Sequence, residues 1–457
     1  MATASEQPPG PERPRFAAAA LTTLATRMAV AALSFASILI VARTLGPTGR
    51  GEVALLTTIA MVSSQLARLG VEEANINVAG TEPANRPALA TNSVVLALAA
   101  GGGCAGLLAA VIAVFPAVGG GADPALVGLA LVSIPVLVLQ PYLTFLIRAD
   151  YRFGVTNASW LAAPAATAVV NGALALAGGL TVATAFGTWV VAHALATVLL
   201  AVYLPVRLAG FGRPSLALAR RTLTFGLRAH LGRVLMVGNY RVDQWFVGAL
   251  AGRRELGLYS VAVAWAEILF YLPTVLVLVQ RPYLVRSQAG EAARRAARVF
   301  RAGLVVTVPL AGLLVVLAGP LCTEVFGADF AGAVDDLRIL ALGAFGVVAL
   351  QQLGNALTAQ RRPELASVAA ALAFAVTIAL DVLLIPRYGG AGAAVASVAS
   401  YLAGGAAVLV LFLRHFDVPL RALTPRVRDV PEVAEQARTA LGRRRGGRSR
   451  GRPTDTR

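Results

Sequence analysis

Long apolar stretches separated by short polar segments fill the chain from about residue 17 to residue 413. A helix needs roughly 20 mainly apolar residues to cross the hydrocarbon core of a bilayer. Stretches of that length, bounded by Gly, Pro and Arg, predict membrane-spanning helices at 17–42, 52–70, 88–115, 124–147, 157–177, 181–204, 222–250, 256–280, 299–318, 333–357, 364–385 and 391–413. The expected fold class is an all-α polytopic membrane protein with twelve transmembrane helices.

Composition supports this class and excludes several kinds of chemistry. The chain is 57% hydrophobic and 14% charged, whereas soluble domains carry about 25% charged residues. All 40 basic residues are Arg, so there is no lysine for a nucleotide-binding loop or a Schiff base. Cys104 and Cys322 lack metal-ligand spacing. We therefore expect no metal site and no cofactor.

The distribution of Arg predicts the orientation in the membrane. The loops on the side shared by both termini, the ends of the spans next to them, the arm and the tail together hold 31 of the 40 Arg residues. Cytoplasmic loops retain basic residues, so both termini are predicted to be cytoplasmic. The first 16 residues lack the features of a removable signal peptide.

Three junctions recur in the two halves of the chain, which indicates an internal repeat. Residues 45–52 match 250–259 at an offset near 206, whereas 148–152 match 359–363, and 178–179 match 389–390, at an offset near 211. With six spans each, the halves cross the membrane in the same sense, as in parallel-repeat transporters. The predicted domains are an arm (1–16), an N-terminal lobe (17–204), a linker (205–221), a C-terminal lobe (222–413) and a disordered cytoplasmic tail (414–457), with the lobes around a central cavity.

Two motifs carry a family resemblance. They are Arg43-Thr44-Leu45-Gly46-Pro47 through Gly51, and Val242-Asp243-Gln244-Trp245-Phe246-Val247-Gly248 running into Leu256 to Ala262. Together with the twelve-span layout, they resemble the Wzx-type polysaccharide flippases of the multidrug/oligosaccharidyl-lipid/polysaccharide exporter superfamily.

This resemblance implies a function. It implies that an undecaprenyl-pyrophosphate-linked oligosaccharide moves from the cytoplasmic to the outer leaflet of a bacterial inner membrane. Transport would use alternating access to a solvated, cationic cavity and coupling to H⁺ or Na⁺. A polysaccharide polymerase and glycosyltransferases are further expected partners.

Arginines inside the predicted spans are candidates for binding the cargo. An ionisable residue at this depth is costly unless it faces a bundle interior or water, and guanidinium groups bind phosphate oxygens bidentately. Arg27, Arg233 and Arg241 are therefore expected to line the cavity. Alternatively, Arg27 and Arg233 extend to the headgroups and an acid neutralises Arg241.

A second group of polar residues is expected to couple transport to an ion or to hold the lobe junction. Asp243 either pairs with a buried Arg or binds H⁺ or Na⁺, and Glu267, with Asn239 nearby, is a second candidate. Asp381 is expected at the membrane interface. Gln65 and Arg68 either line the entrance for a hydrophilic sugar chain or belong to a solvated loop.

The loop 281–301 and the tail 414–457 are strongly basic. Such segments attract anionic lipids, by about 1 kcal/mol for each basic residue. Anionic membrane lipids are therefore expected partners. The Arg-rich stretch 443–452 of the tail has no aromatic residues for base stacking, and no nucleic-acid recognition fold is predicted.

Two other functions remain open. One is a multidrug or peptidoglycan-precursor transporter of the same superfamily. A cation exporter should bury more acids than bases, however, and this chain is expected to bury more bases than acids. The other is a membrane polysaccharide polymerase, but the longest predicted outer loop, 319–332, offers only Glu324 and Asp329. These two form no catalytic constellation, so the protein is not expected to be an enzyme.

Overall fold

The computed structural model describes residues 13–208, 210–426 and 431, and these parts contain no β-strand. The first half forms α1 (Arg13–Ala67), α2 (Val71–Thr81), α3 (Arg86–Val114), α4 (Pro124–Ala149), α5 (Phe153–Leu176) and α6 (Val182–Arg207). The second half forms α7 (Leu216–Leu250), α8 (Arg253–Ala266), α9 (Ile268–Arg286), α10 (Ala289–Phe326), α11 (Ala333–Leu342), α12 (Ala344–Ala359) and α13 (Pro363–Phe416). Short 3₁₀ helices form η1 (Pro83–Asn85), η2 (Pro116–Gly119), η3 (Ala328–Phe330) and η4 (Leu420–Leu423).

Every predicted span coincides with helix in the described part of the chain. Eight helical segments there are long and apolar enough to cross a membrane. Two of them, within α1 and α13, are each interrupted by a glycine with non-helical backbone angles, Gly46 and Gly389, and thus contain two predicted spans. The predicted spans 222–250 and 333–357 lie outside the eight, because α7 carries many charges and α11 is separated from α12 at Gly343. The count of twelve spans stays a prediction.

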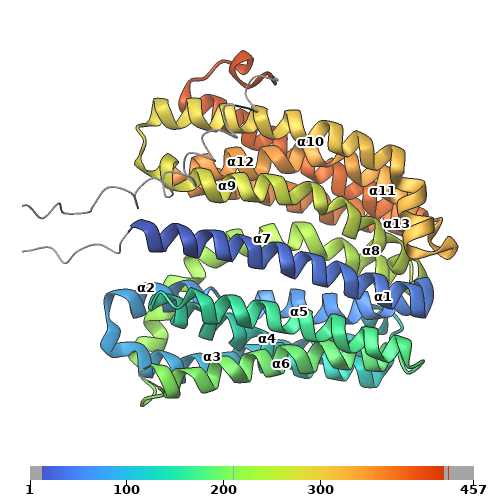
Figure 1. Ribbon diagram of the computed structural model, residues 1–457, viewed down its shortest axis with the longest axis horizontal. Helices are drawn as coiled ribbons and strands as arrows, with labels where there is room; N and C mark the ends of the chain where they lie inside the picture. Colours follow the sequence, from blue (N-terminus) through green and yellow to red (C-terminus); the bar gives the residue numbers. More distant parts are fainter. Residues whose placement is uncertain (1–12, 209, 427–430, 432–457) are drawn as a thin grey trace, which may run out of the picture.

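The helices form two lobes (Figure 1). Helices α2 to α6 lie on one side and α9 to α13 on the other, with α1, α7 and α8 between them. Within the first lobe α1 packs on α4 and α5, and within the second α13 packs on α7 and α12. Contacts between the lobes are made chiefly by α1 and α2 against α7 and α8. This is the two-lobe arrangement that the repeat predicted.

The two ends of the bundle differ in chemistry. Helix α1 begins at the same end as η4 (Figure 1), and the basic segments 281–301 and 414–426 also belong to this end. We call it the Arg-rich end. The opposite end contains the left-handed glycines Gly46, Gly252 and Gly389, and we call it the kink end. The N-terminal arm before Arg13 and the predicted tail beyond residue 431 lie outside the described residues.

Candidate functional site

A buried polar cluster lies inside the C-terminal lobe, around Asp243 of α7. Asp243 is 2% exposed, and its Oδ2 accepts hydrogen bonds from the Tyr259 hydroxyl at 2.5 Å and the Ser397 hydroxyl at 3.1 Å. Its Oδ1 accepts from the backbone N–H of Gln244 at 2.7 Å. These partners come from α7, α8 and α13, so Asp243 lies within one lobe rather than between the lobes.

The same cluster extends one helical turn toward the Arg-rich end. Asn239 Oδ1 accepts hydrogen bonds from the hydroxyls of Thr377 at 2.7 Å and Ser400 at 2.9 Å. Asp243 follows Asn239 by four residues, as Asp381 follows Thr377, and residues at this spacing share a helix face. Because both helices run in the same direction from the Arg-rich end, the carboxylates of Asp243 and Asp381 lie at the same level and interact electrostatically.

Asp381 is the least satisfied member of this cluster. It is fully buried, and neither carboxylate oxygen has a hydrogen-bond partner. The expectation that it lies at the membrane interface stays a prediction. The helix continues beyond it to the kink at Gly389, which places Asp381 inside the bundle. An unpartnered buried carboxylate is costly and is suited to binding a proton or a cation.

Arg241 and Glu267 form an ion pair beside this cluster. The Arg241 Nη2 and Glu267 Oε1 atoms are 2.8 Å apart, and both side chains are partly exposed. A small cavity of about 10 Å³ touches both Asp243 and Glu267 and is walled by Tyr240, Tyr259 and Tyr401 among others. A cavity of this size is about the smallest that can hold one water molecule. The acid expected to neutralise Arg241 is thus Glu267.

At the Arg-rich end, side chains of α7 contact α2. Arg233 pairs with Glu73, and its Nη1 lies 3.7 Å from Oε1 of Glu72. Glu72 is fully buried without a hydrogen-bond partner for either oxygen, and this burial raises its pKa above the ordinary value of 4.5. In contrast, the exposed Arg221 lowers the pKa of Glu82.

Gln65 and Arg68 lie close to this contact, at the end of α1. The Arg68 Nη1 donates to Gln65 Oε1 at 3.0 Å, and Gln65 is buried. The Leu66 carbonyl is 3.1 Å from His230 Nε2 of α7, and the backbones of Gly70 and Gly226 approach so closely that a Cβ on Gly70 would lie 2.3 Å from the Gly226 carbonyl oxygen. The lobes therefore touch at the Arg-rich end.

The lobes also touch at the kink end, through two glycines that the repeat aligns. A Cβ on Gly51 would lie 1.7 Å from the Arg253 carbonyl oxygen, and a Cβ on Gly257 would lie 1.8 Å from that of Pro47. An ion pair of 2.6 Å joins Glu52 to Arg253 across the same contact. The two repeated junctions thus pack against each other.

Arg27 lies far from these pairs in the fold. It is exposed and lies against Trp160 of α5, with 5.5 Å between the guanidinium carbon and the ring centre. The structure thus assigns Arg233 and Arg241 to acidic partners and Arg27 to an aromatic one.

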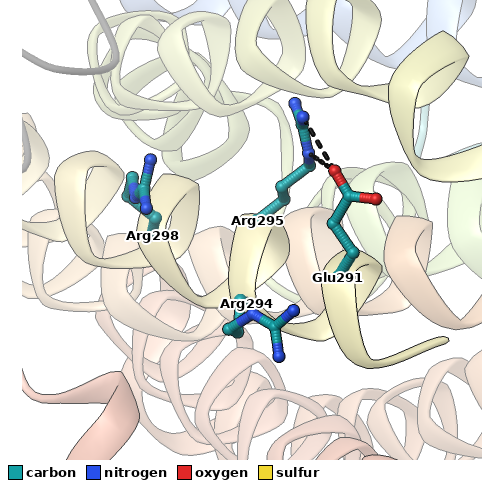
Figure 2. A pocket seen from close by; sticks show the side chains of 4 residues that line it. All are labelled: Glu291, Arg294, Arg295 and Arg298. Carbon is teal, nitrogen blue, oxygen red and sulfur yellow. Dashed lines mark hydrogen bonds and ion pairs between the residues drawn. The ribbon is translucent and has the colours of Figure 1, made fainter. Parts of the chain in front are cut away.

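The basic loop 281–301 is largely helical, because α9 extends to Arg286 and α10 begins at Ala289. Figure 2 shows Arg295 turned toward Glu291, to which it is bonded at 2.9 Å, while Arg294 points away from that pair. With Arg298, these residues line a cavity of about 190 Å³. This surface is therefore rich in positive charge, as the sequence predicted.

The balance of buried charge differs from the expected one. Among the described residues, one Arg is buried, whereas five acids are buried: Glu52, Glu72, Asp243, Asp336 and Asp381. The expected excess of buried bases is therefore wrong, because Arg233 and Arg241 are partly exposed.

Sequence reasoning missed Tyr259, Thr377, Ser397 and Ser400 as partners in the cluster. The four-residue spacing of Thr377 and Asp381 and the three-residue spacing of Ser397 and Ser400 place two polar pairs on helix faces. These two spacings are the features of the sequence that could have identified the partners.

Solved structures of transporters share this fold. An inward-facing MATE family multidrug resistance transporter of the MOP superfamily matches with a TM-score of 0.69 and 14% identity, over 87% of this chain and 98% of that chain. The lipid II flippase MurJ, in an inward closed conformation, matches with a TM-score of 0.64 and 14% identity, over 92% of this chain and 90% of that chain. An outward-facing MATE family multidrug resistance transporter matches with a TM-score of 0.59 and 13% identity, over 87% of this chain and 94% of that chain. The fold is that of the MOP superfamily of transporters.

The sequence also matches a family model, described as polysaccharide biosynthesis protein, over residues 40–335. This match covers more than half of the chain, and the chain belongs to that family. The predicted family resemblance is confirmed, since both motifs lie inside the matched residues. A search of curated proteins finds no match.

Proposed function

We propose that this protein is a flippase that moves an undecaprenyl-diphosphate-linked oligosaccharide from the cytoplasmic to the outer leaflet of a bacterial inner membrane. The observation that carries the proposal is membership of a polysaccharide biosynthesis family by a chain with the MOP transporter fold. The Arg-rich end faces the cytoplasm in this proposal, since cytoplasmic loops retain basic residues.

Alternating access would be governed by the two contacts between lobes. Glycine backbones pack directly at both ends, and at the Arg-rich end Arg233 and Arg221 also reach acids of the other lobe through partly exposed side chains. Exposed ion pairs contribute only about 0–1 kcal/mol. These ion pairs would therefore add little to the cost of opening the Arg-rich end, which suits loading from the cytoplasm.

The diphosphate of the cargo would compete with Glu267 for Arg241. Both partners are partly exposed, so an incoming anion can reach the guanidinium without unfolding the lobe. Bidentate binding to phosphate oxygens replaces the carboxylate at little electrostatic cost. Arg233, paired with Glu73, offers a second contact of the same kind nearer the cytoplasm.

Asp243 and Asp381 would couple the cycle to H⁺ or Na⁺. The cluster presents carboxylate, amide and hydroxyl oxygens, which suit a proton or a hard cation. Asp381 has no partner in this conformation, and a bound cation would relieve the repulsion between the two carboxylates. Because the cluster joins α7 to both halves of α13, loading it changes the packing of the C-terminal lobe.

A second candidate is an ion-coupled exporter of organic cations. The observation that favours it is the excess of buried acids over buried bases. A peptidoglycan-precursor flippase is a variant of the first proposal, and the lipid II flippase MurJ shares the fold. A polymerase is less supported, because Glu324 and Asp329 flank the end of α10 and bring no nucleophile or base together.

Depletion of the protein in its host tests the proposal. Lipid-linked oligosaccharide is expected to accumulate on the cytoplasmic leaflet, out of reach of a membrane-impermeant reagent added outside. When the Arg241→Ala or Arg27→Ala variant is expressed in the depleted host, it should restore transport poorly. Glycan that reaches the outer face but stays unpolymerised would instead indicate a polymerase.

A further inference from the structure

Two arginines near the Arg-rich end lie against one tryptophan. The guanidinium carbon of Arg148, in the last turn of α4, is 3.8 Å from the ring centre of Trp160 on α5, and that of Arg27 on α1 is 5.5 Å away. A pair of hydrogen-bonding side chains, Thr23 and Asn157, joins α1 to α5 beside them. Three helices thus bring two positive charges to one indole.

Neither charge has an acidic partner. Across residues 13–208, 210–426 and 431, no carboxylate oxygen lies within 4.0 Å of either guanidinium group. Asp150, the acid nearest to Arg148 in sequence, is bonded to Arg86 at 3.0 Å and to Arg152 at 3.3 Å. Arg148 donates from Nε to the Thr156 hydroxyl, and its Nη2 is buried without a partner. Charges near hydrocarbon require compensation, so the counter-charge is expected from outside the protein.

The position of the pair along the helix matches a headgroup. Arg27 precedes the kink at Gly46 by nineteen residues, which corresponds to about 28 Å of helix. The hydrocarbon core is about 30 Å thick. If the kink lies near one membrane surface, Arg27 lies near the other, where lipid phosphates are found.

The aromatic contact also leaves guanidinium donors without a carboxylate partner. A guanidinium group that stacks on an indole is held by its face, while the N–H groups along its edge can still bind phosphate oxygens. A carboxylate partner would occupy those donors instead.

We propose that Arg27, Arg148 and Trp160 form a binding site for a lipid-borne phosphate group at the cytoplasmic leaflet. The site is separate from the Arg241–Glu267 pair. Its assignment to the cargo rests on the proposed function, in which the diphosphate would dock here before entering between the lobes. The phosphodiester of a resident phospholipid offers the same chemistry.

The test uses the purified full-length protein in an alkyl maltoside detergent, which carries no phosphate. Undecaprenyl diphosphate and phosphatidylglycerol are titrated separately, and binding is followed by native mass spectrometry. Arg148→Gln and Arg27→Gln should each weaken binding by about tenfold. Arg152→Gln is the matched control, because Arg152 lies four residues further on and already pairs with Asp150; it should change affinity by less than about twofold.

Arg148→Lys provides a variant that keeps the charge and the fold. It should bind with an intermediate affinity, because lysine lacks the planar fork of donors. Tighter binding of undecaprenyl diphosphate assigns the site to the cargo, and tighter binding of phosphatidylglycerol assigns it to a resident lipid. Both results uphold the phosphate site.

The inference is overturned if wild type binds neither lipid, or if Arg148→Gln and Arg27→Gln bind both lipids as tightly as wild type does. This outcome is distinct from failure of the proposed function. Depletion reports where the glycan accumulates whether or not this site exists, and a loss of phosphatidylglycerol binding in Arg148→Gln upholds the site even if the cargo is not a glycan.

Discussion

Glu72 is a buried acid whose ionisation opposes folding. Its side chain is fully buried, neither oxygen accepts a hydrogen bond, and desolvation raises its pKa above 4.5. A carboxyl group with a raised pKa binds protons more tightly in the folded state. Its unfavourable contribution is therefore absent below pH 4.5 and grows as the pH rises through the folded-state pKa.

Glu72→Gln should consequently stabilise the protein at neutral and alkaline pH. We expect the melting temperature in detergent to rise by about 1–3 °C near pH 8 and to change little near pH 4.5. Glu73→Gln is the control, since Glu73 is partly exposed and bonded to Arg233; it should not stabilise. A lower melting temperature for Glu72→Gln at alkaline pH would show that the Arg233 contact outweighs desolvation.

Asp381 offers the most direct experimental test of the proposed coupling to an ion. Asp381→Asn removes the ionisable group and keeps the shape, so transport should lose its dependence on an imposed H⁺ or Na⁺ gradient and fall by about tenfold. The measurement is uptake into proteoliposomes with and without the gradient. Asp335→Asn is the control, because its side chain is 79% exposed. Gradient dependence retained in Asp381→Asn would place coupling elsewhere.

Individual residues could be predicted from sequence only in part. Arg241 and Asp243 stood out because charges in an apolar stretch are costly. Their partners could not be identified, since Glu267 and Ser397 reach them through the packing of separate helices. Asp381 was not singled out as a coupling residue, because hydropathy does not show which face of a helix is buried in the bundle.

At the scale of helices, the repeated glycine junctions determine how the lobes close at the kink end. At Gly51 and at Gly257, the backbone lies so close to a carbonyl oxygen of the other lobe that a Cβ atom would not fit between them. The sequence repeat aligned these two segments at an offset near 206, and the structure packs them against each other.

Gly51→Ala should therefore hold the kink end apart. We expect transport to fall by about tenfold or more and the melting temperature to fall by several degrees. The added Cβ would clash with the Arg253 carbonyl oxygen, and a backbone atom, unlike a side chain, cannot rotate away from the clash. Gly103→Ala in α3 is the matched control, since no atom lies within 4 Å of its added Cβ; replacing a helical glycine there should be neutral or stabilising by up to about 1 kcal/mol. Equal behaviour of the two variants would contradict a closed kink end.

Helices were the most predictable part of the molecule. Apolar stretch length predicted spans that overlap helices in the described part of the chain, because the requirement to cross hydrocarbon dominates local sequence choice. The count of twelve stays a prediction. The merging of neighbouring spans through Gly46 and Gly389, and the short helix α2, depend on backbone angles and lobe contacts that hydropathy does not contain.

At the scale of the whole molecule, the two lobes are in contact at both ends and hold separate groups of charges. Arg27 and Arg148 lie near the Arg-rich end, Arg241 and Glu267 lie further along, and Asp243 and Asp381 lie within the C-terminal lobe. This order suits an anionic headgroup that enters from the cytoplasm and a cation site that drives the change of access.

The central claim is that the protein moves a lipid-linked oligosaccharide between leaflets. The most direct measurement places undecaprenyl-diphosphate-linked oligosaccharide and the purified protein in liposomes and follows how much of the sugar an impermeant glycan-binding probe can reach. Wild type should expose sugar from the inner leaflet many times faster than protein-free liposomes, and Gly51→Ala should not. Transfer no faster than in protein-free liposomes, with H⁺ and Na⁺ gradients applied in either direction, would contradict the account.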